Sequence, residues 1–288
     1  MKKIAVILWN FLAFSLAENS ALANTSTASL DHGNGNGNAK KLTLEFVLAS
    51  EQTKDNNTSE VNGTYNKLDV SALYSLAPDD ELRLFSSALY IAQDDPAAED
   101  QLRGDLVELM YRRKNLLNES DHGVRLEAEL KYYQLIDSET KTLYGFDGAF
   151  IPQLIFTKYL TDSFLTEFKA RHHFNNVTND RASTLKRETR LYLTPTYVLT
   201  RSLFLSTTLK YQHKTRNGDY YSYRTSSFSP KSTDHVTAHP GLMYLINRQF
   251  LIEGYAETEF LTSNDHQTFK ENWEKNYVLG TALYWTAF

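Results

Sequence analysis

The sequence predicts an all-β fold, a closed antiparallel up-and-down transmembrane β-barrel of about 12 strands. Three observations predict it. An export signal begins the chain, the hydropathy alternates with a period of two over most of its length, and short and long connections between the predicted strands alternate.

The N-terminus has the three parts of a secretory signal. Lys2 and Lys3 precede an apolar run over 4–17, and Ala21 and Ala23 supply the small-x-small pattern of a cleavage site. The apolar run is shorter than the ~20 residues that a membrane helix needs. We therefore predict a signal peptide over 1–23, removed in the mature protein.

The amino-acid composition excludes several classes of function. The chain has no cysteine, which excludes a disulfide framework, zinc-thiolate sites and a cysteine nucleophile. Without the predicted signal, 28 basic and 34 acidic residues remain, a net charge of −6 that argues against nucleic acid as a partner. The Asn/Gly/Ser/Thr-rich segment 24–40 is predicted to be a flexible periplasmic leader, and 41–288 is predicted to form the barrel.

Strict alternation of apolar and charged residues predicts the strands. It is clearest in 124–135, where Val124, Leu126 and Ala128 alternate with Arg125 and Glu127. Less regular alternation extends the pattern along the chain. The predicted strands are 42–50, 65–76, 81–93, 103–113, 124–135, 143–160, 164–174, 184–199, 203–214, 235–246, 250–260 and 275–288.

Connection lengths predict which ends of the strands share a side of the membrane. The short connections are 77–80, 161–163, 200–202 and 247–249, and the link 114–122 is the least turn-like of this set. The longer polar connections are 51–64, 94–102, 137–142, 175–183, 215–234 and 263–274. Short periplasmic turns and longer external loops are typical of membrane barrels, so both termini are expected in the periplasm.

The C-terminal segment 276–288 (NYVLGTALYWTAF) is uncharged at every alternate position counted back from Phe288. It resembles the terminal strand of Gram-negative outer-membrane β-barrels, which ends in Phe and is read by the barrel assembly machinery. Tyr284 fits that signal and Thr286 fits it less well. The resemblance covers 41–288 and implies location in the cell outer membrane, with membrane lipid, lipopolysaccharide and the assembly machinery as partners.

The periodicity alone does not say which face is enclosed, because a soluble barrel buries its apolar face and a membrane barrel exposes it. Aromatic residues near strand ends favour the membrane, where they form interfacial girdles. These residues are Tyr111, Tyr132, Tyr144, Tyr159, Tyr197, Tyr211, Tyr244 and Trp285. The charged rows are therefore predicted to face the lumen.

The predicted pore-lining residues carry both signs of charge. They are Arg83, Glu108, Arg112, Arg125, Glu127, Lys131, Glu167, Lys169, Arg171, Lys186, Glu188, Arg190, Lys210, Glu253 and Glu257. Seven of the cations lie on nearby predicted strands and could form a basic ladder for acidic solutes such as uronate oligosaccharides: Arg112, Arg125, Lys169, Arg171, Lys186, Arg190 and Lys210. The same residues could instead form an ordinary salt-bridged interior, because carboxylates interrupt the ladder. About 12 strands is intermediate between a filled barrel and an open channel.

The leading functional hypothesis is an outer-membrane porin-like channel for passive passage of small polar or charged solutes. One alternative is a barrel hydrolase that uses an Asp–His pair on external loops, Asp234–His235 or Asp265–His266. Another is a non-conducting structural or surface-recognition barrel. No catalytic residue is assigned, and neither a metal nor a cofactor is expected.

Overall fold

The computed structural model describes residues 42–55, 64–92, 101–222, 227–264, 268–271 and 276–287. The predicted signal peptide over 1–23, the leader over 24–40 and Phe288 lie outside the described residues, so these predictions stay predictions.

Twelve long strands make up the body of the structure. They are β1 (Leu42–Asp55), β2 (Thr64–Ala77), β3 (Asp80–Ala92), β4 (Gln101–Leu117), β5 (Arg125–Leu135), β6 (Phe146–Thr161), β7 (Phe164–Val177), β8 (Leu185–Val198), β9 (Leu203–Arg216), β12 (Ser232–Leu245), β13 (Phe250–Asn264) and β15 (Asn276–Ala287). The smaller elements are helices α3 (Glu119–His122) and α4 (Ser138–Tyr144) and strands β10 (Tyr220–Ser222), β11 (Ser227–Ser229) and β14 (Thr268–Glu271).

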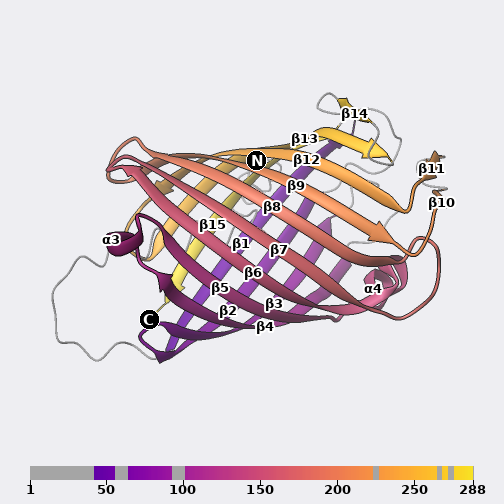
Figure 1. Ribbon diagram of the computed structural model, residues 1–288, viewed down its shortest axis with the longest axis horizontal. Coiled ribbons are helices and arrows are strands. Elements are labelled where there is room, and N and C mark those ends of the chain that lie inside the picture. The colour runs from indigo at the N-terminus through magenta and orange to yellow at the C-terminus, as the bar shows by residue number, and fades with distance from the viewer. Residues whose placement is uncertain are drawn as a thin grey trace, which may run out of the picture.

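The long strands close into one barrel (Figure 1). Each pairs antiparallel with the next along the chain, and β1 pairs with β15 to complete the ring. Because the ring is closed, the backbone of every long strand is hydrogen-bonded to a neighbour on both sides, as a hydrocarbon environment requires. The predicted fold class is thereby confirmed, and the strand number is twelve.

The two ends of the barrel differ. At one end, called here the turn end, lie α3 and the short connections 78–79, 162–163, 199–202 and 246–249. At the other, called here the loop end, lie α4, β14 and the β10–β11 pair (Figure 1). The predicted alternation of short and long connections is confirmed.

Two connections contain short helices that the strand pattern did not predict. The link 114–122 continues β4 to Leu117 and then forms α3, whose first turn is capped by the Asn118 side chain. The predicted strand 143–160 starts too early, because α4 occupies 138–144 and ends at Gly145, which has φ 72°. Tyr144 therefore lies in a helix and not at a strand end. No described helix is long and apolar enough to cross a bilayer.

The outer wall is apolar and the interior is polar. Leu154 on β6 is 43% exposed, whereas its neighbours Gln153 and Ile155 are 4% and 5% exposed. Trp285 stacks on Phe46 and Phe250 on the same wall, with ring centroids 5.0 and 6.0 Å apart. This is the polarity that a bilayer imposes and the reverse of a soluble barrel. The prediction that charged rows are enclosed is confirmed.

Candidate functional site

The candidate site is the enclosed polar interior, and strand register builds it. A row of directly paired residues crosses eight adjacent strands from β3 to β12. Its members are Glu81, Arg112, Glu129, Gln153, Arg171, Arg190, Gln212 and His235. We call this set the polar row. Paired residues share a face of the sheet, so one register places all of them in the interior.

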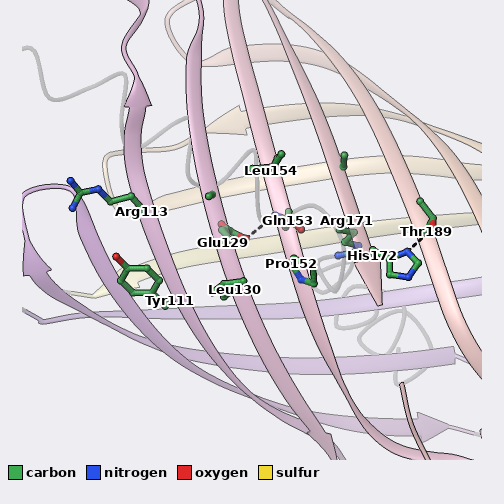
Figure 2. A pocket seen from close by; sticks show the side chains of 12 residues that line it. Tyr111, Arg113, Glu129, Leu130, Pro152, Gln153, Leu154, Arg171, His172 and Thr189 are labelled. Carbon is green, nitrogen blue, oxygen red and sulfur yellow. Dashed lines mark hydrogen bonds between the residues drawn. The ribbon is translucent and has the colours of Figure 1, made fainter. Parts of the chain in front are cut away.

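The part of the polar row on β3–β6 is a buried ionic network. Arg112, only 4% exposed, donates from Nε to Glu129 Oε1 at 2.6 Å and lies 3.7 Å from Glu81. The second oxygen of Glu129 accepts from Gln153 at 2.7 Å (Figure 2). The same oxygen pairs with Lys131 at 3.0 Å. Each charge in this network is therefore compensated where it is desolvated.

Neighbouring charges on β2–β5 are paired in the same way. Arg83 lies 2.8 Å from Glu108, Lys67 lies 3.2 Å from Asp69, and Arg125 and Glu127 are 3.2 Å apart on β5. This side of the interior therefore contains cations and carboxylates in nearly equal number.

Strands β7–β9 form a basic sector. Lys169 lies 3.5 Å from Glu167, and Arg190 lies 2.8 Å from Glu188. The inward positions of the three strands hold six Lys or Arg residues and two carboxylates, a difference of four positive charges. The six are Lys169, Arg171, Arg190, Lys210, Lys214 and Arg216.

The neighbouring wall, formed by β12, β13, β15 and β1, is rich in carboxylates. His239 on β12 lies between Glu257, 3.3 Å from Nδ1, and Glu253, 3.7 Å from Nε2. Glu253 is 1% exposed and accepts a hydrogen bond of 2.5 Å from the Tyr284 hydroxyl. Lys210 of the basic sector reaches across to Glu257 at 3.8 Å, so opposite charges meet at this boundary.

The predicted pore-lining residues lie on the enclosed parity with one exception. Lys186 is exposed, because a register shift between Leu185 and Arg187 displaces it at the loop end of β8. Sequence reasoning did not select Glu81, Lys214 or His239, which also face the interior. Glu81 and Lys214 are end residues of the predicted strands 81–93 and 203–214, so continuing the alternation to those ends would have found them. His239 lies inside the predicted strand 235–246, on the opposite parity to Leu242 and Tyr244, and the same alternation selects it.

The structure corrects the hydrolase hypothesis. Asp234 and His235 are consecutive residues inside β12, so their side chains point to opposite faces. Asp234 accepts from His213 Nδ1 at 2.9 Å, whereas His235 Nδ1 lies 2.9 Å from Glu259. The proposed Asp234–His235 pair is therefore wrong, and Asp265–His266 lies outside the described residues. Within the described ranges no group of three or more His, Asp or Glu residues is arranged to hold a metal ion.

A closed ring of twelve antiparallel strands, apolar outside and ionic inside, defines a transmembrane β-barrel of the outer-membrane type. Solved structures of that class resemble it. The NanC porin matches with TM-score 0.50 and 8% identity over 84% of this chain and 98% of that one. At this identity the likeness shows a shared fold.

Two further solved structures were found. The KdgM porin matches with TM-score 0.46 and 12% identity over 84% of this chain and 99% of its own. The CymD monoaromatic hydrocarbon channel matches with TM-score 0.47 and 9% identity over 95% and 93%. No family model and no curated protein sequence matches the chain.

Proposed function

We propose that this protein is an outer-membrane porin-like channel for passive passage of small polar or charged solutes. The observation that carries the proposal is the polar row, which runs through the enclosed interior across eight strands. Because strands in a barrel are tilted, the row is inclined to the barrel axis. It begins with Glu81 beside the short connection at 78–79 and reaches His235 near the loop end.

Filling the interior of a barrel with charged side chains costs free energy, because burial removes the charges from water. Replacing a buried ion pair by well-packed apolar residues is often neutral or stabilising by roughly 1–4 kcal/mol. A barrel with a purely structural role therefore gains nothing from enclosed charges such as Arg112 and Glu129. Charged side chains are useful where a hydrated solute passes them, which is why we favour a channel over a structural barrel.

The distribution of charge supports a preference for anions. The basic sector on β7–β9 retains four members of the sequence-predicted basic ladder, Lys169, Arg171, Arg190 and Lys210. The other three predicted members do not contribute to the basic sector, because Arg112 and Arg125 are paired with carboxylates and Lys186 is exposed. A path that runs along the basic sector, where positive charges are in excess, favours anions in solution.

Planar bilayer recording tests the proposal. Refolded protein is expected to give discrete conductance steps, and a salt gradient across the bilayer is expected to give a reversal potential of the sign set by anion permeation. Folding is checked by the mobility of unheated protein on a denaturing gel. Folded, inserted protein without conductance would contradict the channel and leave the non-conducting barrel as the function.

A further inference from the structure

A polar cluster interrupts the apolar outer wall near the loop end. Tyr211, His213 and Thr215 alternate on β9 with the inward Gln212 and Lys214, and they pair with outward residues of β12. Asp234 is the register partner of His213, and its side chain is only 4% exposed. A carboxylate and an imidazole thus lie together on the outer face of the barrel, at the loop ends of β9 and β12.

Hydrogen bonds connect three of these side chains in series. Asp234 Oδ1 lies 2.9 Å from His213 Nδ1, and His213 Nε2 lies 3.1 Å from Thr215 Oγ1. An ionised carboxylate can only accept, so Nδ1 carries the hydrogen and Nε2 of the neutral ring accepts from the threonine hydroxyl. The Tyr211 hydroxyl donates to the same Asp234 oxygen at 2.6 Å and holds the carboxylate in place.

We infer that this cluster is an acyl-ester hydrolase site on the outer wall, separate from the lumen. A hydroxyl bonded to an imidazole that a carboxylate orients is the arrangement of an activated nucleophile. Thr215 is the nucleophile, His213 is the general base and Asp234 is the positioning residue. The substrate class is a lipid ester of the membrane leaflet at the loop end.

An apolar groove beside the cluster supplies a place for the acyl chain. The groove, about 590 Å³, is cut into the outer wall (Figure 2). Small or flat side chains form its floor at Ala128, Pro152 and Ala170. At one end it meets His172 and Thr189, joined by a 2.8 Å hydrogen bond, and Thr189 is the register partner of His213.

The course of the groove fits a lipid whose ester lies at the cluster. The far end is Tyr111, whose hydroxyl donates to Asp80 at the turn end. The groove therefore descends from the level of Thr189 toward the opposite side of the bilayer, as an acyl chain does. No other occupant matches an apolar groove on a wall that faces hydrocarbon.

Thr215 and Asp234 lie within three residues of the loop ends of β9 and β12, beside Tyr211, at the level where aromatic residues mark the membrane interface. Arg187 adds a further charge, because it is exposed and is the register partner of Thr215. Its guanidinium is the candidate donor to the oxyanion that forms next to Thr215.

The reaction balances with water as the only co-reactant. His213 Nε2 removes the Thr215 proton as Oγ1 bonds to the ester carbonyl carbon, and the carbonyl oxygen becomes an oxyanion. The ester C–O bond then breaks, and the alcohol leaves with the proton from His213. Water attacks the acyl-threonine in the same way, so the fatty acid is released and Thr215 regains its proton.

Release of fatty acid from phospholipid in mixed detergent micelles tests the site in the full-length protein. Thr215→Ala and His213→Ala are each expected to lower the rate at least about 100-fold, because a positioned base contributes that much. Thr215→Ser is expected to keep activity. His122→Ala, at an exposed histidine of α3 at the turn end, is the control and is expected to leave the rate unchanged.

A second readout locates the covalent bond. An alkyl fluorophosphonate is expected to add its phosphonyl group to Thr215 with loss of fluoride, so the peptide that contains Thr215 gains the mass of the reagent less HF, and the Thr215→Ala protein gains none. Thr215→Ala is expected to keep the wild-type conductance, so failure of the ester site is distinguishable from failure of the channel. Wild-type hydrolysis no greater than that of folded Thr215→Ala protein would overturn the proposal.

Discussion

The ring of Tyr255 on β13 lies against Gly280, its register partner on β15. A Cβ atom at position 280 would clash with the Tyr255 ring and hydroxyl. The ring of His239 stacks on the ring of Tyr255, with centroids 4.2 Å apart and an interplanar angle of 11°. Gly280 is therefore required by the space that a neighbouring aromatic ring occupies.

Gly280→Ala is accordingly expected to destabilise the barrel. Overpacking of this kind costs roughly 1–3 kcal/mol, because Tyr255 must move and lose its stacking on His239. Urea unfolding in lipid vesicles measures the change. Gly254→Ala is the matched control on β13, since a Cβ there meets nothing within 4 Å. Equal stability of the two variants would contradict the clash.

Removal of one partner from the buried ionic network is expected to lower the free energy of unfolding by more than Gly280→Ala does. Arg112→Met leaves the Glu129 carboxylate, 2% exposed, with Lys131 as its one remaining salt-bridge partner among the described residues. Loss of one partner of a buried pair costs about 3–5 kcal/mol. Arg125→Met is the control, because Arg125 and Glu127 are more exposed, at 22% and 13% of their side chains. Unfolding of the two variants at the same urea concentration would refute the difference.

Strand positions and facing could be predicted from the sequence because alternation is local. In 164–174, for example, Glu167, Lys169 and Arg171 share one face wherever the strand lies in the barrel. The predicted strand therefore agrees with β7, and its charged row is enclosed.

Contacts that depend on the register between strands could not be predicted from the alternation within each strand. Asp234 and His213 are far apart in sequence and meet only because β9 pairs with β12. Adjacency in the sequence favoured Asp234–His235 instead. The alternation also did not predict the bulge that displaces Lys186 or the helix α4 at the start of a predicted strand. Neither feature changes the apolar–polar pattern from which strands are predicted.

Charge reversal in the basic sector is expected to change ion selectivity. Lys210→Glu combined with Lys214→Glu replaces two inward cations on β9 by two carboxylates, which changes the sector from an excess of four positive charges to none. The reversal potential in a salt gradient is expected to shift toward cation preference. Lys186→Glu is the matched control, because Lys186 is exposed at the register shift at the loop end of β8. An equal shift in both proteins would show that the basic sector does not line the path.

Single cysteines are expected to report which face of β9 and β13 contacts lipid. The chain has no cysteine, so each substitution introduces the only thiol. Leu209 is 44% exposed on the outer wall, whereas Glu257 faces the interior with 37% of its side chain accessible. In vesicles, Leu209→Cys is expected to react with an apolar maleimide and to resist a charged one, since hydrocarbon excludes the charged reagent. Glu257→Cys is expected to react with the charged reagent, because water that fills the lumen admits it. Detergent-denatured samples, in which both thiols react with both reagents, provide the control. The contrary outcome is that the charged maleimide labels Leu209→Cys and does not label Glu257→Cys. That outcome would mean that the apolar wall faces water and that the barrel is not a membrane channel.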